Sequence, residues 1–147
     1  MTTIIRATKE HISVLIPLLD KYRTFYNQNS DEQAARRFLE NRMKNKDSVI
    51  FLAFYDSSPA GFTQLYSSFS SVSLKPIFIL NDLYVYSEFR NKGIGKVLLN
   101  NAKEYCLLQE YKGLALETGI NNPAQKLYER LGWRRNTTTL HYFWEAK

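Results

Sequence analysis

A single cysteine, Cys106, is present among the 147 residues. One thiol cannot close a disulfide within the chain, and it cannot supply the paired cysteine ligands of a structural zinc site. The two histidines, His11 and His141, lie far apart and lack the short spacing of a metal motif. We therefore expect no metal, a buried structural thiol, and a protein of a reducing compartment, the cytoplasm.

Long apolar runs are also absent. No stretch approaches the roughly 20 residues that cross a membrane as a helix. The first residues, MTTIIRATKEH, lack the apolar core of a secretory signal. We expect no membrane span and no membrane partner.

Acidic residues are the minority, since 20 Lys and Arg against 14 Asp and Glu give a formal net charge of +6. Such a charge admits a nucleic acid, an acidic membrane or a polyanionic small molecule as partner. The basic residues are spread along the chain, and those within 126–135 are accompanied by no RNA- or DNA-binding motif. A basic nucleic-acid binder stays an alternative, but we expect no nucleic-acid partner.

The chain has no repeat and no long linker, and 44% of its residues are hydrophobic, so we expect one domain over 1–147. Apolar spacing predicts a helix from Thr8, bent or interrupted at Pro17, and a second helix that begins at a capping box, Ser30 to Gln33. The remaining expected elements are strands at 49–55, 61–69, 77–85, 113–118 and 139–145, and helices over 94–110 and from Asn122 to Gly132. This order predicts an α/β fold with helices around a mixed, mostly antiparallel sheet.

The stretch EFRNKGIGKVLL, residues 88–99, combines glycines, basic residues and a helix start. It is not a P-loop, which needs Ser or Thr where Val97 stands, and not a dinucleotide fingerprint, which needs glycine where Leu98 stands. Backbone amides at the helix start can still face an anion, and Gly93 and Gly95 let a phosphate come close. The alternative is a glycine turn that only caps a helix beside surface cations.

Residues Arg90 to Gly95 resemble the R/Q-x-x-G-x-G/A loop of the GNAT superfamily of N-acetyltransferases. Downstream, NNPAQKLYERLGW, residues 121–133, is similar to the family's N-x-x-A-x-x-L/F-Y-x-x-x-G-F/W segment. The two segments lie in the family's order, with a helix and a strand between them. The resemblance implies the GNAT fold over the whole chain, in which two splayed strands form a slot for acetyl-CoA.

The resemblance assigns the acetyl-CoA contacts to three places. The backbone of Leu83, Tyr84 and Val85 would pair with the pantetheine arm, and the Asn121 side chain would hydrogen-bond the same arm. The pyrophosphate would be held by the loop residues Arg90, Asn91, Lys92, Gly93, Ile94, Gly95 and Lys96.

Tyr128 matches the tyrosine that acts in the family as general acid toward the departing CoA thiolate. Phenols and alkyl thiols have comparable pKa values, about 10 and about 8.5, so this proton transfer need not be uphill. The alternative is that Tyr128 only packs the core of an amphipathic helix.

The acceptor site is less well defined by the sequence. A lysine-like amine must lose a proton before it attacks, which requires roughly 4.6 kcal/mol at pH 7. The polyamine and diamine acetyltransferases, which this chain resembles most, carry a Glu-Asp pair where this chain has Asn81-Asp82. Asp82 is then left as substrate anchor or water-relayed base, with Glu117 in reserve, unless both only accept structural hydrogen bonds. Aromatic residues of the first helices and of 61–69, Tyr26 among them, are candidate walls for the amine.

These features predict an acetyl-CoA-dependent N-acetyltransferase that acts on a primary amine of a small molecule of the polyamine, diamine or amino acid type. Direct attack in a ternary complex is expected, because neither motif supplies a nucleophile and Cys106 lies within a helix. The alternatives are a CoA-binding module without turnover and an acetyltransferase for a protein amine. Many relatives are homodimers, so the resemblance also implies a homodimer, to which the C-terminal HYFW segment could contribute.

Overall fold

The computed structural model describes residues 1–147. In chain order its elements are β1 (Thr2–Arg6), the 3-10 turn η1 (Lys9–His11), α1 (Ile12–Phe25), α2 (Glu32–Asn45), β2 (Ser48–Tyr55), β3 (Ser58–Ser70), β4 (Lys75–Val85), the 3-10 turn η2 (Ser87–Phe89), α3 (Ile94–Leu108), β5 (Leu114–Ala115) and α4 (Ala124–Arg130). The chain divides into two compact units, Met1–Glu117 and Thr118–Lys147. The first unit holds the whole sheet with α1, α2 and α3, and the second holds α4 and the C-terminal segment.

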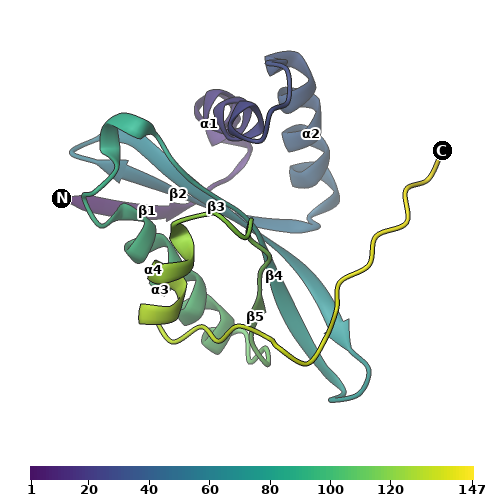
Figure 1. The fold of residues 1–147 in the computed structure, drawn as a ribbon. Coiled ribbons are helices and arrows are strands. Elements are labelled where there is room, and N and C mark those ends of the chain that lie inside the picture. The colour runs from purple at the N-terminus through teal and green to yellow at the C-terminus, as the bar shows by residue number, and fades with distance from the viewer. The chain divides into compact units, whose positions relative to one another are not determined.

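The sheet contains five strands in the order β1-β2-β3-β4-β5 (Figure 1). The first three pairings are antiparallel, and β4 pairs with β5 in parallel. The predicted mixed, mostly antiparallel sheet flanked by helices is confirmed. The strand β1 was missed by the sequence analysis, because its five residues are too few to show a clear alternation. It pairs along β2 from Thr2 opposite Tyr55 to Arg6 opposite Phe51.

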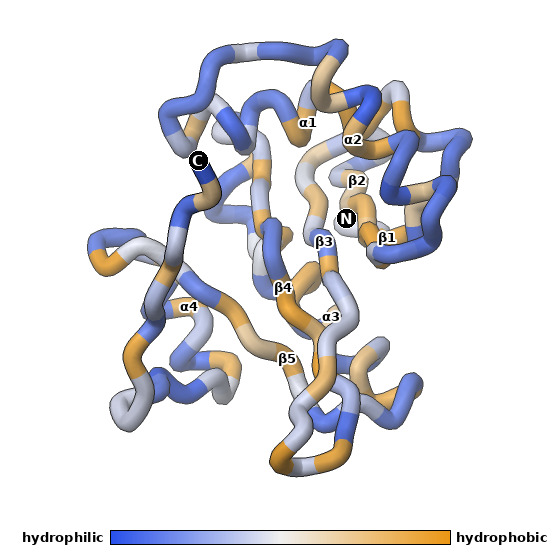
Figure 2. The backbone as a smooth tube through the Cα atoms, turned by 90° about the vertical axis from the view of Figure 1, so that its right-hand side faces the viewer, coloured by the Kyte–Doolittle hydropathy of each residue, from blue (hydrophilic) through white to orange (hydrophobic).

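Helices cover both faces of the sheet: α1 and α2 lie on one face and α3 on the other (Figure 1). The strand residues alternate between the faces, as their period of two requires. Ile50 and Leu52 pack with α1 and α2 in the main buried cluster, whereas Phe51 packs on Tyr105 of α3 with ring centroids 5.3 Å apart. Hydrophobic stretches accordingly run along the strands, for example along β4 (Figure 2).

The helix α1 continues through Pro17, so of the predicted bend or interruption the interruption is wrong. Proline removes one backbone hydrogen bond and disfavours a helix interior. Buried residues lie on both sides of it, namely Leu15, Ile16, Leu18 and Leu19. Their burial against the sheet offsets the cost of the proline.

A buried carboxylate joins the end of α1 to the start of α2. Asp20 accepts a 2.6 Å hydrogen bond from the Ser30 hydroxyl and a 2.7 Å hydrogen bond from the backbone N–H of Asp31. The predicted capping box at Ser30 is therefore wrong, because that hydroxyl is directed to Asp20. The N-cap of α2 is Asp31, whose side chain accepts from the backbone N–H of Ala34 at 3.0 Å.

Replacing Asp20 by alanine should lower the free energy of unfolding by about 3 kcal/mol at pH 7, because two hydrogen bonds to a buried carboxylate are lost. Burial alone would raise the pKa of Asp20, but the hydrogen bonds from Ser30 and Asp31 and the charge of Arg23 outweigh it and lower the pKa. A carboxyl with a lowered pKa stabilises the fold above its unfolded value, about 3.8, and this stability is lost as the pH falls through the folded value.

Urea unfolding at pH 7 and pH 3 tests this expectation, with the difference between native protein and variant shrinking at pH 3. Asp47→Ala is the matched control, because Asp47 is exposed and its ion pair with Arg42 should contribute at most about 1 kcal/mol. An equal loss at both pH values for Asp20→Ala would contradict the assignment.

The C-terminal part differs most from expectation. Residues 139–145 form no strand, so that prediction is wrong, and β5 is limited to two of the six residues predicted for it. Leu140, Tyr142, Phe143 and Trp144 are largely exposed. Residues 139–145 contain β-branched and aromatic residues, which favour a strand. A strand forms, however, only where its backbone finds a hydrogen-bonding partner.

The predicted helix end in the second unit is confirmed. Gly132 has φ of +90° just after α4, the left-handed conformation that glycine adopts at a helix C-terminus. The N–H of Trp133 closes the turn on the carbonyl of Tyr128 at 3.0 Å. At the other end, the Asn122 side chain accepts from the backbone N–H of Ala124 at 2.9 Å.

Candidate active site

The strand β4 carries a bulge at Asn81. Its register with β3 pairs Asp82 with Gln64 and Leu80 with Leu65, so Asn81 is an extra residue. On the other edge, β4 and β5 pair only at Phe78–Leu114 and Ile79–Ala115. Beyond these pairs this edge of β4 has no strand beside it, while β3 still pairs along the other edge. We call the point after Ile79 and Ala115, where the two strands stop pairing, the fork.

The free edge of β4 beyond the fork includes the backbone predicted to bind pantetheine. The N–H of Tyr86 donates to the carbonyl of Ala60 on β3 at 2.8 Å. Because successive residues of an antiparallel strand direct their backbone groups to opposite sides, Tyr84 also faces β3, while Leu83 and Val85 face the free edge. The Val85 carbonyl accepts from Arg90 Nε at 3.1 Å, in agreement with this orientation.

The strands β3 and β4 approach closely at this edge. A Cβ on Gly61 would lie 2.6 Å from the Tyr84 carbonyl oxygen and 3.2 Å from Val85 Cα. Any side chain at position 61 would push the edge outward, so this glycine keeps the backbone of Tyr84 and Val85 in place.

The predicted phosphate loop leads from η2 into α3. Gly93 is the N-cap of α3, with φ of +77°, and Asn91 also has a positive φ of 63°. Since glycine has no side chain, no side-chain acceptor caps the helix, and the first amides of a helix have no partner within it. Nothing lies within 4 Å of the position that a Cβ on Gly93 would take. The loop thus presents donors to an open space.

Two basic side chains of the loop, Arg90 and Lys92, lie over aromatic rings. The Arg90 guanidinium is 5.6 Å from the Tyr84 ring centroid and 5.8 Å from that of Phe25, and Lys92 Nζ is 5.2 Å from that of Tyr55. Ile94 is buried, so of this residue only the backbone can reach a ligand. The positive charges and the helix start together favour an anion here.

A buried polar cluster lies beside the fork. Asp82, 4% exposed, accepts from the side-chain amide of Gln64 and from Asn81 Nδ2, the latter at 2.9 Å. Burial raises the pKa of Asp82, and the hydrogen bonds from Gln64, Asn81 and Tyr22 oppose this rise. Its backbone carbonyl accepts from Thr63 Oγ1 at 2.7 Å, which further fixes the strand.

Aromatic residues surround this cluster on the side of α1. Tyr22 donates its hydroxyl to the Asn81 carbonyl at 3.1 Å, and its ring lies 5.1 Å from Tyr26 and 6.0 Å from Tyr84. Tyr26 is 46% exposed, so part of this aromatic surface is open to a ligand. Burial, followed by the Asp82 charge, raises the pKa of Tyr66 to about 12.

The structure brings most, but not all, of the predicted site residues into one unit. The free edge, the loop, Tyr26, Asp82 and Glu117 lie in Met1–Glu117, and Glu117 follows β5 just past the fork. Asn121 and Tyr128 belong to Thr118–Lys147. Within that unit Asn121 is exposed, and the partly buried Tyr128 ring is 6.0 Å from Trp133.

Gln64 is a polar site residue that the sequence analysis missed. It is fully buried, holds Asp82, and leaves its Oε1 without a hydrogen-bond partner. The sequence feature that could have revealed it is the glutamine inside the apolar strand sequence GFTQLY. A glutamine buried in a core strand needs a polar partner, which indicates a polar cluster there.

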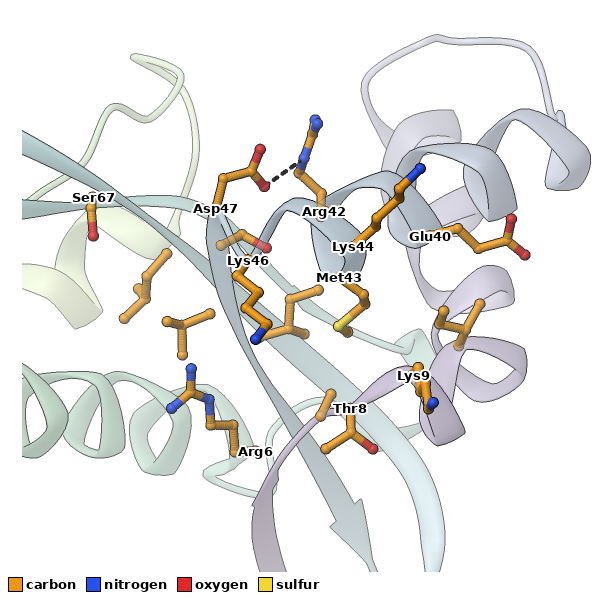
Figure 3. A pocket seen from close by; sticks show the side chains of 16 residues that line it. Arg6, Thr8, Lys9, Glu40, Arg42, Met43, Lys44, Lys46, Asp47 and Ser67 are labelled. Atoms are coloured by element: carbon orange, nitrogen blue, oxygen red, sulfur yellow. Dashed lines mark hydrogen bonds and ion pairs between the residues drawn. The ribbon is translucent and has the colours of Figure 1, made fainter.

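A separate cleft lies where β1 ends, away from these residues (Figure 3). Its volume is about 780 Å³, and its wall includes Arg6, Lys9, Lys44 and Lys46 around an apolar floor. Arg42 on its rim is paired with Asp47 at 2.8 Å. None of the predicted site residues lines this cleft.

The chain has counterparts among known proteins. A sequence model of the acetyltransferase (GNAT) family matches residues 15–133. The chain belongs to this family. The GNAT model spans the loop, the fork, Asp82 and Tyr128 alike.

Two similar proteins cover almost the whole GNAT chain. An uncharacterized N-acetyltransferase, YhfO, of Bacillus subtilis (strain 168) is 44% identical over 138 residues, which are 93% of each chain. The crystal structure of a probable acetyltransferase is 40% identical, covers 99% of this chain and 98% of its own, and has a TM-score of 0.92. The chain is therefore an acyl-CoA-dependent N-acetyltransferase.

A more distant structure shows the same fold with a ligand. An aminoglycoside N-acetyltransferase, AAC(6')-Iy, in complex with CoA has a TM-score of 0.81 at 19% identity, over 99% of this chain and 96% of that one. Acetyl-CoA is the acetyl donor of GNAT acetyltransferases. In the present structure no group of three or more His, Cys, Asp or Glu side chains could hold a metal ion, and no helix is long and apolar enough to cross a membrane.

Proposed function

We propose that the protein transfers the acetyl group of acetyl-CoA to a primary amine of a small molecule, of the polyamine, diamine or amino acid type. The observation that best supports this proposal is the fork in the sheet, where a buried carboxylate, Asp82, and the aromatic ring of Tyr22 lie beside the free edge of β4. Negative charge and tyrosine faces both attract an ammonium group.

The residues present suit acetyl-CoA. Leu83 and Val85 direct backbone groups to the free edge, where an extended pantetheine arm can pair as a strand would. The amides before and at the start of α3, with Arg90, Lys92 and Lys96, suit the pyrophosphate. Asn121 is the proposed further contact to the arm. When bound, acetyl-CoA supplies a thioester whose carbonyl carbon the amine attacks.

Residues of the chain handle the protons in this proposal. Tyr128 donates its hydroxyl proton to the departing sulfur as the new carbon–nitrogen bond replaces the carbon–sulfur bond. The proton released by the attacking nitrogen goes to water or to a carboxylate, for which exposed Glu117 is placed just past the fork. Cys106 takes no part, because it is buried within α3 and burial raises the pKa of its thiol.

The acceptor is proposed to enter beside α1. Tyr26 and Tyr22 provide partly open aromatic surface, and Asp82 and Glu117 provide the acidic charge for a cationic amine. In this proposal residues 1–147 act as one acetyltransferase domain, since the two segments that resemble the family, Arg90 to Gly95 and Asn121 to Trp133, are divided between the two units.

We also propose that the protein acts as a homodimer in the cytoplasm. The large exposed side chains of the C-terminal segment, Leu140, Tyr142, Phe143 and Trp144, support this, because contiguous exposed apolar surface commonly marks an interface. Light scattering of the free protein at a mass near 17.2 kDa would contradict the dimer.

The proposed function is tested by CoA release with acetyl-CoA and a panel of amines: spermidine, 1,4-diaminobutane, lysine, an aminoglycoside and a short peptide with a free N-terminus. Turnover on a small amine should exceed that on the peptide by about tenfold or more in kcat/KM. Turnover on the peptide alone would instead indicate a protein amine as acceptor. Binding of acetyl-CoA without turnover on any member would indicate a CoA-binding module.

A further inference from the structure

Asn81 lies at the fork itself. Ile79 and Ala115 are the last paired residues of β4 and β5, and Asn81 follows Ile79 by two positions on β4. Asn81 is exposed, although Asp82 beside it is buried. The residue that replaces the expected acid is therefore the one that can meet a ligand at this point.

The Asn81 side chain has a fixed orientation. Its Nδ2 donates to Asp82 Oδ1 at 2.9 Å, and its backbone carbonyl accepts from the Tyr22 hydroxyl at 3.1 Å. Turning the amide over would set its oxygen against the Asp82 carboxylate, which is repulsive. The amide oxygen Oδ1 consequently faces away from Asp82 and has no hydrogen-bond partner in the protein.

Asp82 cannot take the same role without moving. Only 4% of its surface is exposed, and both carboxylate oxygens already accept from amides, Oδ2 from Gln64 and Oδ1 from Asn81. A ligand that reached this carboxylate would have to displace one of the two amides.

We propose that Asn81 contacts the acceptor amine, with Oδ1 accepting a hydrogen bond from the attacking N–H, and that Asp82 is the positioning residue that holds the Asn81 amide in this orientation. The inference rests on the proposed function and assigns its acceptor contact. A carboxamide oxygen binds the N–H of an ammonium and of a neutral amine alike, but it cannot take a proton. Asn81 therefore orients the nitrogen, and the proton leaves by another group.

Asn81→Ala should weaken binding of the amine to the CoA-bound protein about tenfold and lower kcat/KM for the amine about tenfold or more, as expected for a lost hydrogen bond to a charged donor. The probe is the member of the amine panel with the highest kcat/KM, and titration calorimetry gives its Kd independently of turnover. The Kd of acetyl-CoA should change less than twofold. Asn41→Ala is the matched control, because it removes an exposed amide from α2 on which no proposed contact depends.

A double-mutant cycle separates positioning from direct contact. Asp82→Ala has no acceptor oxygen, so it should release the Asn81 amide and weaken amine binding about as much as Asn81→Ala. In the Asn81→Ala background, Asp82→Ala should change the amine Kd less than about twofold. Thermal unfolding checks that each variant is folded, and Asn81→Ala alone decides the contact if the Asp82 variants are not.

The possible outcomes separate the two proposals. Full activity and amine affinity in Asn81→Ala would overturn the Asn81 contact while leaving the acetyltransferase proposal intact. Multiplicative losses in the double mutant would show that Asp82 meets the amine itself and would overturn its positioning role. A native protein that neither binds nor acetylates any amine of the panel would overturn both.

Discussion

Replacing Gly93 by valine is expected to weaken acetyl-CoA binding about 100-fold, equivalent to about 2.7 kcal/mol. Gly93 starts α3 with φ of +77°, and the space where its Cβ would stand is empty of protein atoms within 4 Å. A valine side chain would fill the space before the loop amides, which is where the pyrophosphate is proposed to lie. It would also strain the backbone by about 1–2 kcal/mol, because L-residues disfavour this region.

Comparison with Gly132→Val separates the effect of blocking the proposed pyrophosphate site from the effect of backbone strain. Gly132 has φ of +90° and likewise no atom within 4 Å of a Cβ, so its substitution should cost similar thermal stability. Titration calorimetry with acetyl-CoA on both variants measures the difference in affinity. If Gly93→Val bound acetyl-CoA as tightly as the native protein, the loop would be only a helix cap beside surface cations.

Tyr128→Phe is expected to lower kcat about 100- to 1,000-fold at neutral pH, the range for loss of a general acid. The hydroxyl proton is proposed to neutralise the departing thiolate, and phenylalanine cannot supply it. The ring remains, so its packing near Trp133 and the thermal stability should change little. Steady-state CoA release and the Kd of acetyl-CoA, expected to be unchanged, together identify a defect in the chemical step.

Tyr111→Phe is the control for loss of a phenol. The Tyr111 hydroxyl lies 3.1 Å from Ser67 Oγ, and no catalytic role depends on it. This variant should keep its kcat within about twofold. A similarly small effect in Tyr128→Phe would assign Tyr128 to core packing and leave protonation of the thiolate to water.

Most of the fold follows from local patterns in the sequence. Helical spacing, a Pro-Ala helix start and the glycine after Leu131 act within a few residues, and α1 to α4 form where they predict. The strands β2, β3 and β4 are likewise found, within one to three residues of their predicted ends. The predictions that failed concern strands, which depend on distant partners. The strand β1 forms because β2 lies beside it. Residues 139–145 have the composition of a strand but no strand to pair with, so they form none.

The motifs of the candidate site could be predicted from the sequence, whereas the contacts between its residues could not. Arg90 to Lys96 and Asn121 to Trp133 were identified from residue types at fixed spacing, which a linear sequence displays. The bulge at Asn81, the amide of Gln64 against Asp82 and the Tyr22 hydrogen bond join residues 15 to 59 positions apart. No local pattern encodes such pairings, since they depend on strand register and on which helix covers the sheet.

By itself the sequence determined the family and the acetyl donor, because the loop and the downstream segment are defined by glycine, proline and a helix start at fixed spacing, which act locally. The tertiary structure decided which polar group of the Asn81-Asp82 pair is exposed. One extra residue in β4 relative to β3 leaves Asn81 at the fork, while Asp82 is buried against Gln64. Burial of a charge depends on everything packed around it, so Asp82, the acid that remains of the expected pair, is buried, whereas Asn81, which stands in place of the other acid, is exposed.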